Sequence, residues 1–258
     1  RVLFRSNCIP MSGAAPLLSS AAAGAENSDS HAWRRAGLRY HSYRYFLSRK
    51  FSSSRVQKVS LDAGFTCPNV DGSVAIGGCT FCDNRSFSPS RRGKLASASV
   101  RQQAENILAQ LDDGIRRLKQ RYDVNSFIAY FQPATNTYAP VERLRGIYEA
   151  ALSHPLVVGL AIGTRPDCVP NEVLDLLQEL AARTYLSIEY GMQTMHNKSL
   201  SWMNRGHHHD ATIDAIERSR GRGFEICGHA ILGLPCESHT DMLATAREVA
   251  RLQFDAVK

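Results

Sequence analysis

The chain of 258 residues has no run of eighteen or more uncharged apolar residues, so no segment is expected to cross a membrane as a helix. It also lacks a convincing secretory signal peptide, and its seven cysteines are an odd number. Both features argue against a disulfide framework. They favour a cytoplasmic protein without a membrane partner, in which cysteines bind a metal, hold a cluster or stay free.

Acidic residues are few, and residues 33–58 contain none, which contributes to a net charge of +7. A basic aromatic segment suits a polyanion such as RNA. An amphipathic helix that packs Tyr43, Phe46 and Leu47 on the protein and leaves its arginines in water explains the same residues. We predict three regions: a disordered or artefactual N-terminal extension at 1–32, a basic aromatic helix or arm at 33–55, and a core at 56–258.

Short β-branched runs alternate with segments of helical period from Val56 onward. Strands are expected at 56–64, 126–132, 157–164, 185–192, 225–234 and 254–258. Helices are expected at 100–118, 141–151 and 172–182, and after a capping box at Ser238 and Asp241. This alternation predicts an α/β fold with parallel strands, either a partial (β/α)6 TIM-like barrel or an open doubly wound sheet. Functional residues are then expected beyond the carboxyl ends of the strands.

Three cysteines, Cys67, Cys79 and Cys82, follow the first expected strand at C-x11-C-x2-C spacing, without a fourth cysteine nearby. An iron–sulfur cluster held by three thiolates leaves one iron open to a ligand that is not protein. Zinc with Cys168, Cys227 or a histidine as its fourth ligand is the alternative. Spacing alone leaves both interpretations open, whereas purely structural thiols and a four-cysteine ferredoxin fit the pattern less well.

Several ordered motifs extend the pattern over most of the chain. From about Tyr40 to Lys258 the sequence closely resembles the radical S-adenosylmethionine (SAM) superfamily, in particular the YhcC-like proteins, which share the long-spaced cysteine motif with the Elongator catalytic subunit. The resemblance is carried by LDAGFTCPNVDG, GGCTFC, FQPATNTYAP, GLAIGTRPDCVP, IEYGMQT, NRGH and HAILGLP.

The resemblance implies a radical SAM enzyme with the partial (β/α)6 barrel of that superfamily, and a sixth strand truncated at Lys258. Cys67, Cys79 and Cys82 would bind a [4Fe–4S] cluster, which Phe81 would shield. An electron donor such as flavodoxin or ferredoxin would reduce the cluster. Reductive cleavage of SAM would yield a 5′-deoxyadenosyl radical that abstracts hydrogen from an unknown substrate, either a small molecule or RNA.

The remaining cofactor contacts are expected at strand ends. By position, Gln132 would meet the SAM amino group. Arg165 would hold a carboxylate of SAM or of the substrate, unless Asp167 merely neutralises it. Glu189 would accept the ribose hydroxyls, the alternative being an ion pair with an arginine such as Arg165.

After the fifth strand, the GLP segment of Gly233, Leu234 and Pro235 would approach adenine, although Cys236 stands where relatives usually have glycine. His229 is a candidate substrate contact. The histidines at 207–209 are assigned to the surface or to a capping role. No residue is assigned to catalysis itself.

Two further functions remain in view. One is a radical SAM enzyme that modifies tRNA. The other is a non-catalytic metal-binding module that contacts nucleic acid through residues 33–58, for which binding would depend strongly on salt and not on SAM.

Overall fold

The computed structural model describes residues 3–4, 32–52, 55–83 and 99–258, and its centre is one seven-stranded sheet. The strand order is β1-β7-β6-β5-β4-β3-β2. Strands β2 to β7 pair in parallel, whereas β1 is antiparallel to β7. The strands are β1 (Leu3–Phe4), β2 (Val56–Leu61), β3 (Ser126–Phe131), β4 (Val157–Thr164), β5 (Tyr185–Gln193), β6 (Glu225–Ala230) and β7 (Ala256–Val257).

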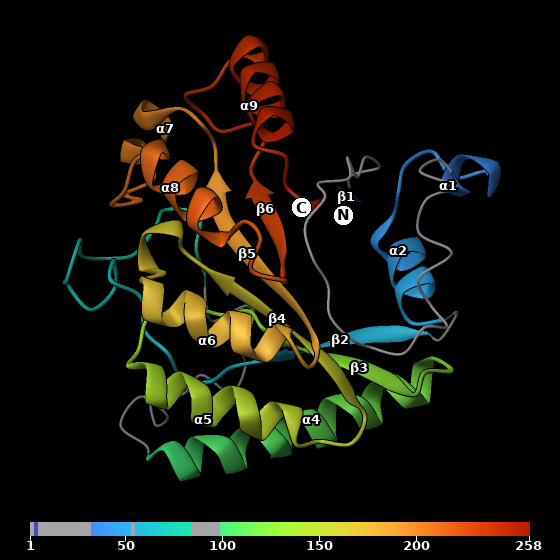
Figure 1. Cartoon of the computed structure of the whole chain (residues 1–258). Coiled ribbons are helices and arrows are strands. Elements are labelled where there is room, and N and C mark those ends of the chain that lie inside the picture. Colours follow the sequence, from blue (N-terminus) through green and yellow to red (C-terminus); the bar gives the residue numbers. More distant parts are fainter. Residues whose placement is uncertain (1–2, 5–31, 53–54, 84–98) are drawn as a thin grey trace.

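The helices connect consecutive strands, which confirms the predicted α/β fold (Figure 1). The six parallel strands form one open sheet, as expected for a partial barrel. The helices are α1 (Ala32–Arg35), α2 (Tyr43–Lys50), α4 (Val100–Arg121), α5 (Val141–Leu152), α6 (Asn171–Ala181), α7 (Asn197–Trp202), α8 (His209–Ser219) and α9 (His239–Arg251), with a 3₁₀ turn at Pro166–Cys168.

The two faces of the sheet bury different side chains, because successive residues of a strand point to opposite faces. On the outer face, Phe127 and Phe131 of β3 belong to the main core with buried residues of α4, α5, α6 and α8. On the inner face, Ile128 and Tyr130 pack with Leu47 of α2. Figure 1 shows α2 on the opposite side of the sheet from α4, α5 and α6.

Helix α2 is the amphipathic helix expected in the basic segment. Ser42 caps it by accepting a hydrogen bond from the backbone N–H of Tyr45 at 3.2 Å. Leu47 is buried, and Tyr43 and Phe46 pack around it, while Arg44 is exposed. The basic segment therefore closes the inner face of the sheet with its apolar side.

The prediction for residues 1–32 lies outside the described residues except at Leu3–Phe4, which form β1, and at Ala32, which begins α1. The three-region division stays a prediction. The predicted capping box of Ser238 and Asp241 at the start of α9 is confirmed. The sequence did not predict α7 and α8, and β6 ends at Ala230 rather than at residue 234.

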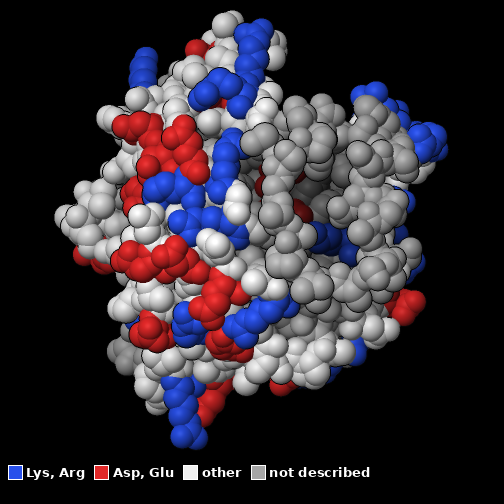
Figure 2. Space-filling view, in the orientation of Figure 1, with Lys and Arg blue, Asp and Glu red and all other residues white. Residues whose placement is uncertain are grey.

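Ion pairs connect the outer helices to one another. Figure 2 shows basic and acidic side chains interleaved on this face. Arg145 of α5 makes two hydrogen bonds, of 2.7 and 2.8 Å, to the carboxylate of Glu179 on α6. Arg222 reaches Asp175 of α6 at 2.7 Å. In the described part of the chain no helix is long and apolar enough to cross a bilayer.

Candidate functional site

A cavity of about 410 Å³ opens at the carboxyl ends of the strands and contains the predicted cysteines. This is the edge where parallel α/β sheets place their sites. Among the residues that line the cavity are Cys67, Cys79, Phe81, Cys82, Gln132, Arg165, Glu189, Gln193, Arg205, His229 and Lys258.

The cysteine loop between β2 and α4 is held by its own backbone. The carbonyl of Cys67 accepts a hydrogen bond from the N–H of Val70 at 2.7 Å, and that of Cys79 accepts one from Cys82 at 3.0 Å. Gly77 and Gly78 have φ angles of +86° and +78°, a region that glycine adopts without steric cost. These glycines let the chain reverse between the first cysteine and the C-x2-C pair.

The turn after α7 anchors this loop from the other side. Asn204 donates hydrogen bonds to the carbonyls of Ile76 and Gly78 at 3.0 and 2.9 Å. A Cβ on Gly206 would lie 2.7 Å from the side-chain oxygen of Asn69. Only glycine allows the turn to approach so closely, so the NRG segment is a structural partner of the cysteine loop.

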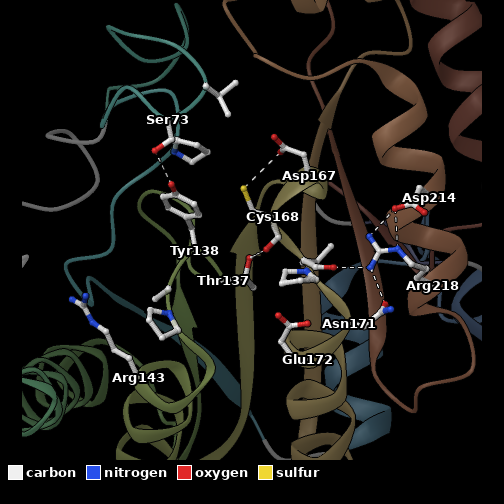
Figure 3. Close-up of a pocket in the computed structure, with 16 residues that line it drawn as sticks. Ser73, Thr137, Tyr138, Arg143, Asp167, Cys168, Asn171, Glu172, Asp214 and Arg218 are labelled. Carbon is white, nitrogen blue, oxygen red and sulfur yellow. Dashed lines mark hydrogen bonds and ion pairs between the residues drawn. The ribbon is translucent and has the colours of Figure 1, made fainter.

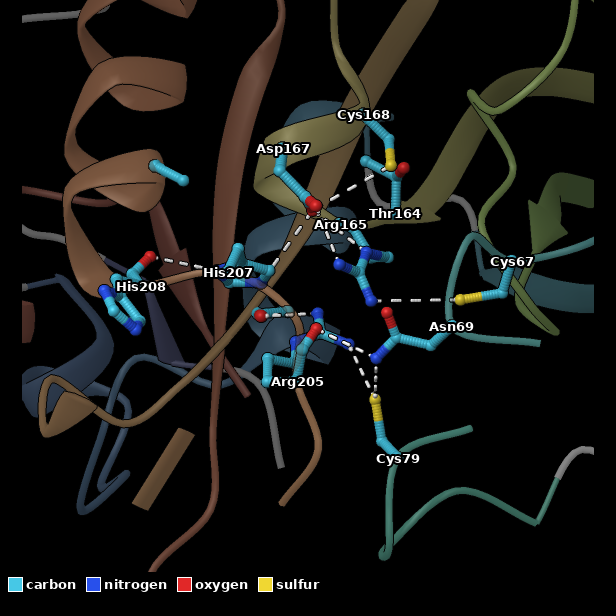
Figure 4. A network of polar contacts seen from close by, with 12 residues as sticks. Cys67, Asn69, Cys79, Thr164, Arg165, Asp167, Cys168, Arg205, His207 and His208 are labelled. Atoms are coloured by element: carbon cyan, nitrogen blue, oxygen red, sulfur yellow. Dashed lines mark hydrogen bonds and ion pairs between the residues drawn. The ribbon is translucent and has the colours of Figure 1, made fainter. Parts of the chain in front are cut away.

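Two buried arginines lie beside the cysteine sulfurs (Figure 4). Arg165 Nη1 is 4.0 Å from Cys67 Sγ, and Arg205 Nη1 is 3.5 Å from Cys79 Sγ. Asn69 Nδ2 is 3.4 Å from the same Cys79 sulfur. Three N–H donors therefore point at these two sulfurs, an arrangement that suits sulfur ligands of a metal or cluster.

Asp167 holds Arg165 in place. The guanidinium donates to both carboxylate oxygens, from Nε at 2.9 Å and from Nη2 at 2.7 Å. Burial would raise the pKa of Asp167, but the hydrogen bonds and charge of Arg165 outweigh it and lower the pKa. The neutralising role considered for Asp167 is therefore observed, and Nη1 of Arg165 remains directed at Cys67.

The assignment of the three adjacent histidines to the surface or a cap is wrong for two of them. The side chain of His207 is 4% exposed and its Nε2 lies 3.9 Å from Asp167. Burial, with the charge of Arg205, lowers the pKa of His207 to about 4. His209 lies in α8, and its Nε2 is 2.7 Å from Glu248 of α9. The side chains of His207, before α8, and of His209, its first residue, thus point into the protein, whereas His208 is exposed.

Below the cysteines, five polar side chains form a layer that we call the polar floor: Lys58, Tyr130, Glu189, His229 and Lys258. The carboxylate of Glu189 is the centre of this layer. It accepts a short hydrogen bond from Lys58 and one of 2.9 Å from Tyr130, and it lies 2.7 Å from His229 Nε2 and 3.7 Å from Lys258 Nζ.

Glu189 is ionised in this layer. Burial alone would raise its pKa, but the hydrogen bond to His229 and the charges of Lys58 and Lys258 outweigh burial and hold the pKa far below its usual value. Arg165 is not its partner among the described residues, so the alternative ion pair expected from the sequence is not observed.

The structure brings most of the predicted site residues together. The three cysteines, Phe81, Gln132, Arg165 and Glu189 line one cavity. The described residues Gly233, Leu234 and Pro235 do not line it, and Leu234 is buried against Leu200 and Met203. Their adenine contact stays a prediction.

The described cysteines 168 and 227 do not line the cavity either, which leaves the zinc alternative without its fourth sulfur ligand there. Both thiols are buried. Cys236 lies outside this cavity too, and its Sγ is 3.3 Å from the hydroxyl of Ser199.

Sequence analysis missed several residues that line or support the cavity. Arg205 lies in the NRGH motif and Asn69 in the CPN motif, so both positions were within segments already recognised. Lys58 and Lys258 had no such signal. A lysine in a strand pattern reads as a solvent-facing residue, but Lys58 shares the inner face of β2 with Val56, and Lys258 follows β7.

A larger cavity of about 1080 Å³ lies on the other side of the loop after β4 (Figure 3). Three of its charged residues, Arg218, Asp214 and Asp167, have charged partners. Arg218 binds Asp214 at 2.7 Å and donates to the carbonyl of Val169, and Asp167 is bound to Arg165. Since this cavity contains none of Cys67, Cys79 and Cys82, we place the functional site in the smaller one.

The family model of the radical SAM superfamily matches residues 76–249. The uncharacterized protein YtqA of Bacillus subtilis is 41% identical over 220 residues, which cover 85% of this chain and 65% of that protein. Protein YhcC of Escherichia coli is 39% identical over 213 residues, covering 82% of this chain and 64% of that protein. The chain thus matches slightly less than two thirds of the length of these relatives.

The fold has a solved counterpart in the Elp3 protein of Methanocaldococcus infernus. That structure aligns with a TM-score of 0.50 at 18% sequence identity, over 76% of this chain and 42% of the other. At this identity the likeness concerns the fold alone. The family match establishes that this chain belongs to the radical SAM superfamily, and YtqA and YhcC are relatives at about 40% identity.

Proposed function

We propose that the chain is the core of a radical SAM enzyme in which Cys67, Cys79 and Cys82 bind a [4Fe–4S] cluster. SAM would bind the iron that the three cysteines leave open. The main support is the convergence of these cysteines in one cavity with two buried arginines beside them.

The residues around the cysteines fit such a group. Arg205 Nε is buried and, within the described part of the chain, has no hydrogen-bond partner. The Nη1 groups of Arg165 and Arg205 already point at cysteine sulfurs. An anionic sulfur cluster is stabilised by donors around it, and an unsatisfied buried donor is costly unless a ligand completes it.

When bound, the cluster and SAM would supply the radical that abstracts hydrogen from a substrate. The chain's own contribution is orientation and exclusion of water. Asp167 fixes Arg165 through Nε and Nη2, and Nη1, which faces the sulfur of Cys67, is the nitrogen proposed to reach a carboxylate of SAM or of the substrate. Phe81 and Gln132 line the cavity wall and are proposed to contact the cluster and SAM, respectively.

The proposed contact between Glu189 and the ribose of SAM would compete with hydrogen bonds that Glu189 already makes. Both of its oxygens already have partners in the polar floor, so a ribose hydroxyl would have to displace one of them. A soluble carrier such as flavodoxin or ferredoxin is the proposed electron donor.

The test is anaerobic reconstitution with iron and sulfide, followed by reduction with dithionite in the presence of SAM. We expect a brown protein that releases 5′-deoxyadenosine. The variant in which Cys67, Cys79 and Cys82 are all alanine should lose both properties, whereas Cys236→Ala, which alters a cysteine outside the cavity, should retain them. A colourless wild-type protein with stoichiometric zinc would contradict the proposal.

RNA is a second candidate substrate, favoured by the basic residues around α1 and α2. Arg34, Arg39, Arg44 and Arg49 are all exposed. If RNA binds there, the affinity should fall steeply with salt, and replacing these arginines with glutamine should reduce the salt dependence. Binding that does not change with salt or with the substitutions would eliminate this candidate.

A further inference from the structure

The polar floor lies near the carboxyl ends of the central strands. Glu189 pairs with Gly163, one residue before the end of β4, and Tyr130 lies one residue before the end of β3. Lys58 lies on β2, Tyr130 on β3 and His229 on β6, and Lys258 follows β7. Beneath the floor, Tyr43 of α2 carries the ammonium group of Lys58 over its ring at 4.6 Å.

The charges of the floor do not balance. In the described part of the chain, Glu189 is the one carboxylate that pairs with Lys58 or Lys258. Two lysines therefore share one counter-ion, and His229 adds a further polar nitrogen. An excess of positive charge in a partly buried layer is unfavourable unless an anion compensates it.

The exposed fractions of the side chains show which groups of the floor face the cavity. The side chain of Glu189 is 1% exposed, whereas those of Lys258 and His229 are 33% and 24% exposed. Lys258 and His229 also line the cavity. The carboxylate of Glu189 is therefore covered, and the side-chain nitrogens of Lys258 and His229 are the more exposed groups of the floor.

The backbone holds Lys258 in this position. Its N–H donates to the carbonyl of Gly228 at 2.9 Å, and its carbonyl accepts from the N–H of Ala230 at 2.9 Å. Its ammonium group donates to the hydroxyl of Tyr130 at 2.9 Å. A long side chain fixed in this way loses little further freedom when it binds a ligand.

We propose that the polar floor binds the anionic group, a carboxylate or a phosphate, of a small-molecule substrate, with Lys258 and His229 as its contacts. This inference rests on the proposed function, because it names the class of substrate for the same cavity. It places the charged end of the substrate at the floor and leaves the rest of the molecule on the side of the cysteine loop.

A metal ion is the competing occupant, because ligand atoms of Glu189, Cys227 and His229 lie within 4.8 Å of one another. Two features oppose it. Lys58 and Lys258 already occupy the carboxylate of Glu189. Burial, together with the charge of Glu189, raises the pKa of the Cys227 thiol well above its usual value, which disfavours the thiolate that a metal needs.

The experiment is calorimetric titration of the anaerobically reconstituted chain with succinate and with glycerol 3-phosphate. Succinamide and glycerol, which lack the charge, are the neutral controls. We expect at least one of the two anions to bind and neither neutral analogue to bind. The better anion shows whether a carboxylate or a phosphate fits the floor.

Substitutions in and outside the polar floor test whether the anion binds there. Lys258→Gln should lower the affinity for the more tightly bound anion about tenfold or more, since it removes a charge-assisted contact. Lys258→Arg should restore most of the affinity, and Lys198→Gln, which alters an exposed lysine on α7, should not change it. Glu189→Gln should strengthen anion binding because it removes the competing negative charge. Thermal melts of each variant confirm that it is folded.

The outcomes separate this inference from the proposed function. Release of 5′-deoxyadenosine without binding of either anion would overturn the inference alone. Anion binding that depends on Lys258 would support it even if no deoxyadenosine formed. Stoichiometric zinc binding that is lost in Cys227→Ser, without anion binding, would replace the anion by a metal.

Discussion

The polar floor and the outer helical face use the same charged residue types in opposite ways. On the outer face, Arg145 and Glu179 form a matched pair with side chains 34% and 53% exposed. In the floor, two lysines share the buried Glu189. Exposed pairs contribute little to stability, whereas buried and unequal charges are costly and are retained where a ligand needs them. The burial of charged side chains and the balance between positive and negative groups therefore indicate function better than the number of charges.

The largest effect is expected from Glu189→Gln. The substitution keeps the shape but leaves Lys58 and Lys258 without their shared carboxylate, so the free energy of unfolding should fall by about 3 kcal/mol. Urea unfolding measures this change. The matched control is Glu179→Gln on the outer face. If Glu189→Gln lowers the free energy of unfolding no more than the control does, the buried carboxylate is no more important for stability than the exposed one.

A smaller effect is expected at Glu225, which lies at the start of β6 with its side chain 21% exposed. Burial and the charge of Asp255 raise its pKa from 4.5 to about 7, although Lys50 opposes them. The unfolded chain therefore releases this proton first, and the stability that the protonated group contributes is lost as pH rises from about 4.5 to about 7.

The substitution Glu225→Gln removes this dependence. We expect the variant to match the wild type near pH 4 and to be more stable by roughly 2 kcal/mol near pH 8. Thermal or urea unfolding at several pH values measures it. If the wild type and Glu225→Gln have equal free energies of unfolding from pH 4 to pH 8, then ionisation of Glu225 does not destabilise the folded protein.

The smallest effect is expected from Arg145→Gln on the outer face. The pair with Glu179 is bidentate but exposed, so its loss should leave the free energy of unfolding nearly unchanged. High salt should remove even this difference, because it screens exposed charges. A loss comparable to that of Glu189→Gln would show that the outer pairs are as important as the floor.

Much of the site could be predicted because its signals are local. Cys67, Cys79 and Cys82 follow a strand within a short glycine-containing loop, and β-branched runs identified all six parallel strands. The capping box before α9 was equally local. Structures specified by a few neighbouring residues can be predicted from the sequence, because they form without contacts to distant residues.

The polar floor could not be predicted in the same way. Lys58 and Glu189 are 131 residues apart in sequence and meet because β2 and β5 belong to one sheet. Similarly, His207 and His209 look like surface residues in the sequence, but in the fold they lie beside Asp167 and Glu248. Contacts between distant strands depend on tertiary geometry, which no local pattern encodes.

The central claim is that three cysteines hold a [4Fe–4S] cluster whose open iron binds SAM. The most direct measurement is the electron paramagnetic resonance spectrum of the reconstituted, dithionite-reduced chain before and after SAM is added. The account predicts a reduced cluster signal that changes with SAM and is absent when Cys67, Cys79 and Cys82 are replaced by alanine. A cluster signal that SAM leaves unchanged, or one that persists without these cysteines, would contradict it.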